Sequence, residues 1–187
     1  FDPVRLYGFL PRRDDLQKNG SEIRRFLLRL KMKTGETDIL LLLADQEEAL
    51  SRLYETLSVV LHDMESFWSK LAEEEHTHAK LFGTIRKLAL AGKVDLKRDV
   101  FRPAALRQVI AYLDRKTAEI IRSGTTAHRA LSLAIDIERS LVEKSGFSVL
   151  EPNNARVRDM LDSLDRHTQK HIARLEKRLA AESASGK

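Results

Sequence analysis

Cysteine is absent from this chain of 187 residues. Disulfides, thiolate metal sites, iron–sulfur clusters and cysteine nucleophiles are therefore excluded. Glycine and proline are also scarce, with 8 and 4 residues, so the chain lacks the turns that many short strands would need. The longest aliphatic run, Ile39 to Ala44, is far too short to cross a bilayer. We expect an all-α protein without a membrane span, located in the cytoplasm.

Positive charge is concentrated near the start of the chain. Residues 1–33 hold nine basic and four acidic side chains, which accounts for the whole net charge of +5. Such a basic arm can bind nucleic acid, anionic lipid or an acidic protein. Because no interleaved aromatic residues or recognition motif accompany it, we expect residues 1–38 to form a solvated leader with a short helix near Glu22–Lys33, and we expect no nucleic-acid binding. An adaptor that docks this arm on an acidic partner is an alternative.

Most of the remaining chain shows the hydrophobic pattern of helices. Apolar residues recur at spacings of three and four, which is typical of a helix with one buried stripe. Breaks at Gly35, Gly92, Gly124 and Pro152 divide this pattern, and Pro103 suits a helix start. The pattern predicts a tight turn at 62–65 and helices over residues 39–61, 66–91, 103–122, 126–149 and 155–181.

The predicted helices form two long hairpins. The connection between the hairpins is about 35 residues long and contains a helix of its own. A four-helix bundle with one long crossover has this order of elements. We therefore expect one bundle domain over residues 39–182, followed by a disordered tail over residues 183–187.

Each of the four hairpin helices carries polar residues where its buried stripe should be apolar. In chain order these residues are Glu47, Glu75, His78, Glu138, Thr168 and His171. A bare carboxylate in a protein core costs several kcal/mol unless it is paired or binds a cation. Polar groups at such positions on four helices therefore indicate one shared polar centre.

The two hairpins place these residues at matching heights. Glu47 and His78 lie equally far from the first turn, and Glu138 and His171 lie equally far from the turn at Asn154. The hairpins also superpose with an offset of 91 to 93 residues. This regularity indicates an internal duplication.

The segment Glu75-His76-Thr77-His78 has the spacing of a metal motif. Residues three apart share one face of a helix, so its first carboxylate and last imidazole can converge on one cation. Carboxylate with imidazole suits iron or manganese, and zinc as well. Hydrogen-bonded or ion-paired core groups are the alternative. The predicted metal ligands are Glu47, Glu75, His78, Glu138 and His171.

Some neighbours of these residues have open or minor roles. Glu48 is an alternative to Glu47, although the buried stripe favours Glu47. Tyr54 lies two turns after Glu47 and can either donate a hydrogen bond to a bound carboxylate or serve only in packing. We expect solvent-facing side chains or no special role at Glu73, Glu74, His76, His62, His128 and His167.

The segments around the predicted ligands resemble the rubrerythrin-like proteins of the ferritin-like superfamily. Residues 47–54 and 67–79 are similar to the first hairpin of those proteins, and residues 134–141 and 168–171 to the second. The resemblance implies a ferritin-like four-helix bundle that binds one or two iron ions. It also implies a homodimer that acts as an oxidase or peroxidase, or in iron handling, with an electron donor that the sequence does not identify.

Two features depart from that family. Thr168 stands where the second Glu-x-x-His motif would have its bridging glutamate, which leaves three carboxylates in place of four. The Cys pairs of a rubredoxin domain are absent, so the electron relay of full-length rubrerythrin is missing. A degenerate bundle that serves as a non-catalytic interaction or oligomerisation module is therefore a further alternative.

Overall fold

The computed structural model describes residues 38–97, 102–143 and 147–185. Within these ranges the chain is helical and contains no strand, which confirms the all-α class. None of the described helices combines the length and apolar character that a membrane span requires. The basic leader falls on residues 1–37, outside the described ranges, and so do the predictions made for it.

The described helices follow the predicted order closely. The α-helices are α3 (Ile39–Val60), α4 (Glu65–Leu90), α5 (Pro103–Ser123), α6 (Ala127–Glu143) and α7 (Ala155–Ser185), with 3₁₀ turns η2 (His62–Met64) and η3 (Phe147–Leu150). Asp38 caps α3 by accepting hydrogen bonds from the amides of Leu40 and Leu41. Gly124 directly follows the last residue of α5 and has φ +67°, a conformation that glycine adopts without strain.

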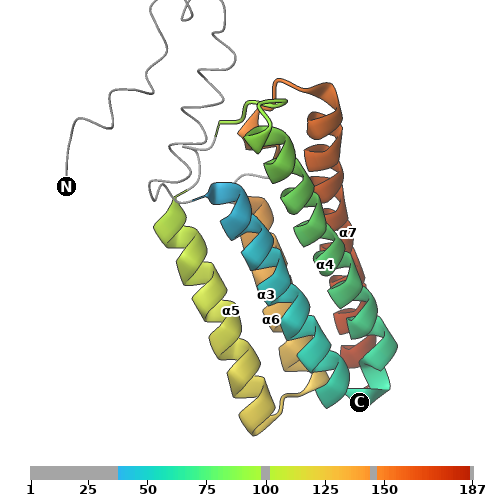
Figure 1. Ribbon diagram of the computed structural model, residues 1–187. Coiled ribbons are helices and arrows are strands. Elements are labelled where there is room, and N and C mark those ends of the chain that lie inside the picture. Colours follow the sequence, from blue (N-terminus) through green and yellow to red (C-terminus); the bar gives the residue numbers. More distant parts are fainter. Residues whose placement is uncertain (1–37, 98–101, 144–146, 186–187) are drawn as a thin grey trace, which may run out of the picture.

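The helices pair as two antiparallel hairpins. Figure 1 shows α3 and α4 side by side in opposite directions, and α6 and α7 likewise. Helix α5 forms the crossover and runs along the outer side of α3. An ion pair of 2.9 Å between Arg52 and Asp114 also joins these two helices. Because α5 runs the length of the molecule, α4 and α6 point in the same direction. The predicted arrangement of two hairpins and a helical crossover is therefore present.

Two helix ends differ from the prediction. The helix expected over residues 126–149 is described only to Glu143, and η3 follows at Phe147–Leu150. The amide of Phe147 donates to Asp165 Oδ1 over 2.7 Å, and its ring packs edge-on against Phe82 at 4.8 Å. These contacts replace helical hydrogen bonds at that point. In addition, α7 continues to Ser185, so residues 183–185 are helical and the prediction of a disordered tail was wrong for them.

The buried core is divided into two apolar clusters. One contains Leu50, Trp68 and Leu175, and the other contains Leu43, Phe82 and Leu164. On α3, α4 and α7 the predicted polar residues lie between a member of one cluster and a member of the other. The bundle therefore holds a polar layer between two apolar layers.

Candidate metal centre

All five predicted ligand residues lie in the polar layer. Glu47 comes from α3, Glu75 and His78 from α4, Glu138 from α6 and His171 from α7. None of these residues is more than 3 % exposed. The sequence thus predicted correctly which residues meet inside the bundle, whereas metal binding by them stays a prediction.

The five residues form two groups that share Glu75. In the group of Glu47, Glu75 and His78, and in the group of Glu75, Glu138 and His171, the potential ligand atoms all lie within 4.8 Å of one another. Oε2 of Glu75 is 2.8 Å from Nδ1 of His78, while Oε1 is 2.6 Å from Nδ1 of His171. Each oxygen of this one carboxylate therefore faces a different group.

Of the two adjacent candidates Glu47 and Glu48, only Glu47 points into the polar layer. Glu47 is buried, and its Oε2 lies 3.9 Å from Nδ1 of His78. Glu48 instead forms an ion pair with His76 over 2.8 Å on the outer side of the hairpin. Glu47 is therefore the member of the centre.

Tyr54 both donates a hydrogen bond within the polar layer and packs in the core. Its hydroxyl donates a hydrogen bond of 2.8 Å to Oε1 of Glu138. Its ring is fully buried and lies 5.6 Å from the ring of Trp68. The tyrosine of the first hairpin thus orients a carboxylate of the second.

Further polar residues outside the polar layer contact the outer ring nitrogens of His78 and His171. Nε2 of His171 lies 3.0 Å from Oε2 of Glu74, which is also paired with Arg174. Nε2 of His78 lies 3.2 Å from Nδ1 of His167. The expectation of a solvent-facing Glu74 was wrong, because its side chain is only one-third exposed and bridges α4 to α7.

The matching spacing of the two hairpins contains a signal for these outer contacts. Glu74 and His167 are 93 residues apart, and each directly precedes the equivalent positions of Glu75 and Thr168. Each reaches across to the histidine of the other hairpin. Such a partner fixes which ring nitrogen of a ligating histidine faces the metal.

Burial strongly affects the carboxylates of the layer. It raises the pKa of Glu47 well above its usual range, and the nearby charge of Glu75 adds to this effect. Burial, followed by the charge of Glu138, raises the pKa of Glu75 to about 7. Both shifts follow from placing negative charge in a poorly hydrated interior. The metal-free centre therefore favours protonated carboxylates.

The two histidines respond differently to their surroundings. Burial lowers the pKa of His78. Burial also disfavours the charged form of His171, but the neighbouring carboxylates of Glu138 and Glu75 outweigh it and raise the pKa of His171 to about 10. A positive charge is therefore held between Glu75 and Glu138 in the metal-free protein. This is the place that a metal ion would take.

Apart from the histidines, the described residues provide no buried basic side chain to neutralise the three buried carboxylates. No lysine or arginine of the described chain is among the buried residues. Oε1 of Glu47 has no hydrogen-bond partner, and Oε1 of Glu75 lies close to His171 without an aligned hydrogen bond. Buried oxygens of this kind are costly unless a cation binds them. The donor set of three carboxylates and two imidazoles fits divalent iron or manganese, and also zinc.

Thr168 does not contribute to either ligand group. Its side chain is buried, and its hydroxyl donates to the carbonyl of Leu164, 3.2 Å away on the same helix. Asp165, the nearest acid on α7, accepts the hydrogen bond from the Phe147 amide. The centre therefore has only three carboxylates, as the sequence indicated.

The shifted pKa values predict that metal affinity rises with pH. A metal ion binds the deprotonated forms, so protons compete at Glu75 below its pKa of about 7 and at His171 below its pKa of about 10. We expect affinity to fall about tenfold per pH unit for each competing proton. Chelator competition from pH 6 to 8, with calorimetry in two buffers to detect released protons, measures this. Equal affinity across that range without proton release would contradict it.

Comparisons of this chain with protein-family models, curated proteins and solved structures find no match. The functional assignment therefore depends on the arrangement and chemistry of the polar layer.

Proposed function

We propose that this chain is a ferritin-like bundle, similar to rubrerythrin, that binds two divalent metal ions with iron as its physiological metal. The observation that carries the proposal is the position of Glu75, whose two oxygens face two different ligand groups. The order of elements also supports it, because two antiparallel hairpins joined by one long crossover are typical of this fold.

Glu47, Glu75 and His78 would hold one ion, and Glu75, Glu138 and His171 the other. Iron bound there supplies one- or two-electron redox chemistry with oxygen or peroxide. Around the ions, Tyr54 orients Glu138 and Glu74 orients the ring of His171. The apolar clusters on both sides limit access of water to the layer.

These 187 residues hold no thiol-based reductant. The chain has no cysteine, so it contains neither a rubredoxin-type iron site nor a redox-active disulfide. The family resemblance leads us to expect a homodimer. Light scattering of the purified protein measures the oligomeric state.

Metal analysis tests the proposal directly. We expect two iron ions per chain after anaerobic addition of ferrous iron and removal of the excess. We also expect oxidation of the bound iron by peroxide to be faster than that of ferrous iron in buffer. One ion per chain would contradict the two-ion centre, and no bound ion after reconstitution with iron, manganese or zinc would overturn the proposal.

The missing fourth carboxylate favours a second candidate function. A bundle with Thr168 in place of a bridging glutamate could keep metal only to stabilise an interaction module. In that case the ions would raise the thermal stability of the protein, but the bound iron would not react faster with peroxide than iron in buffer. The peroxide measurement therefore separates the two candidates.

A further inference from the structure

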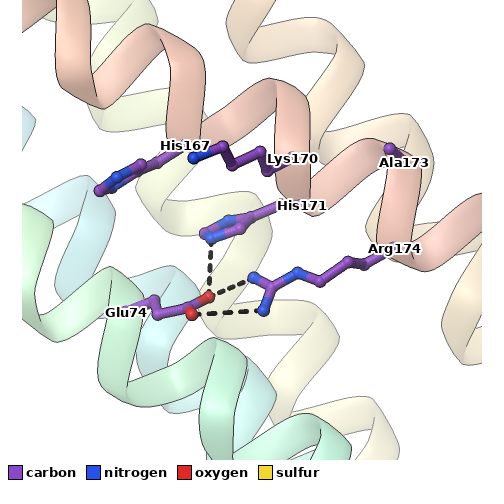
Figure 2. A pocket seen from close by; sticks show the side chains of 6 residues that line it. All are labelled: Glu74, His167, Lys170, His171, Ala173 and Arg174. Carbon is purple, nitrogen blue, oxygen red and sulfur yellow. Dashed lines mark hydrogen bonds and ion pairs between the residues drawn. The ribbon is translucent and has the colours of Figure 1, made fainter.

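A pocket of about 410 Å³ lies against the metal centre, between α4 and α7 (Figure 2). Its lining consists of Glu74, His167, Lys170, His171, Ala173 and Arg174. Ligand pockets commonly begin at about 300 Å³, so this one has room for a small organic molecule. Because His171 belongs both to the pocket and to the polar layer, a ligand in the pocket would lie beside the centre.

The two basic side chains of the pocket differ in their partners. Arg174 is engaged by Glu74 through both of its terminal nitrogens, which compensates its charge. Lys170 has no carboxylate partner among the described residues, and Figure 2 shows its side chain extending towards His167 rather than Glu74. The pocket therefore has one uncompensated positive charge, that of the exposed Lys170 at its rim.

The proposed centre has an excess of positive charge as well. Two divalent ions carry four positive charges, and the layer supplies only three carboxylates, because Thr168 bonds to its own helix. Excess charge in a buried site is costly unless a counter-ion neutralises it. An anion beside His171 would supply the missing charge.

We propose that this pocket binds a small anion, either an organic carboxylate or an inorganic oxyanion, with Lys170 as its counter-charge. The inference rests on the proposed function, because the two divalent ions proposed there supply part of the positive charge that would attract the anion. A positive rim raises the local concentration of anions and lowers that of free metal cations. The pocket therefore suits an anionic ligand better than a metal cation.

Binding to the zinc-loaded protein tests this proposal without any redox reaction. Acetate, benzoate and phosphate are titrated separately by calorimetry and by NMR at constant ionic strength. We expect saturable binding of at least one probe. We expect Lys170→Glu to weaken that binding about tenfold, the effect of losing one charge-assisted hydrogen bond.

Lys177→Glu is the matched control. Lys177 is exposed on the same helix and does not line the pocket. Because both substitutions replace a lysine with a glutamate, they change the net charge of the protein equally. We expect this variant to bind the probe within about twofold of the unchanged protein, since a distant exposed charge is screened by salt. Equal weakening by the two substitutions, or no saturable binding of any probe, would overturn the pocket.

The outcomes also separate this inference from the proposed function. Binding of benzoate or acetate without phosphate supports a carboxylate ligand, and the reverse supports an inorganic oxyanion. Zinc content is measured in every sample. A protein that holds zinc but binds no probe contradicts only the pocket. A protein that holds no zinc, iron or manganese contradicts the proposed function, while the same titration of the metal-free protein still tests the pocket.

Discussion

Replacing Glu75 with glutamine should remove both metal ions at once. Its two oxygens face two different histidines, so each ligand group loses its shared member. The amide keeps the shape of the side chain, which leaves the apolar clusters intact. We expect affinity for both ions to fall by more than about 100-fold, since even outer partners of metal ligands are worth 10- to 100-fold. Metal content after gel filtration measures the loss.

Two other substitutions show whether Glu75 is special. Glu138 belongs to only one ligand group, so Glu138→Gln should remove one ion and leave the other. Glu73 is an exposed acid two residues before Glu75, so Glu73→Gln should leave metal content unchanged. If Glu75→Gln kept one ion, or if Glu138→Gln lost both, the shared carboxylate would be contradicted.

Replacing Glu47 with glutamine should stabilise the metal-free protein and weaken metal binding. Burial raises the pKa of Glu47 in the folded state above its ordinary value of 4.5. The folded state therefore binds this proton more tightly than the unfolded state, and its contribution to the free energy of unfolding falls as pH rises above 4.5. A neutral amide removes this penalty. We expect a gain of about 1–3 kcal/mol at pH 7.

Chemical unfolding of the metal-free protein at several pH values measures this gain. The gain should shrink as pH falls towards 4.5, where the carboxyl is protonated in both states. Glu48→Gln is the matched control, because Glu48 is the next residue and pairs with His76 outside the bundle. A Glu47→Gln protein less stable than the original would mean that Glu47 supports the fold instead of a metal ion.

Much of the fold could be predicted from the sequence because hydrophobic spacing and helix breaks are local signals. Pro103 and Gly124 bound α5 as expected. The end of α6 was missed because the prediction passed over the local turn signal Ser145-Gly146, which precedes the apolar Phe147 and Leu150. Their place in the core is set by α4 and α7 through contacts such as Phe147 with Phe82. Contacts of this kind are invisible to local periodicity.

The residues of the candidate centre also fall into two groups: those that local sequence patterns identify and those whose contacts depend on how the helices pack. Glu47 and His171 could be identified because each interrupts an apolar stripe, and hairpin symmetry set their heights. Glu74 could not be identified in this way, because an acid beside the stripe usually faces water. Its contacts with His171 and Arg174 depend on how closely α4 approaches α7.

The two ligand groups differ in how much of the chain must be folded before they exist. Glu47, Glu75 and His78 all belong to the hairpin of α3 and α4, which emerges first during synthesis. The second group joins Glu75 to Glu138 and His171, and so it forms only after the crossover has returned the chain. The first ion could then bind while only the hairpin of α3 and α4 has folded. The second ion would bind only after both hairpins have come together, and it would link them.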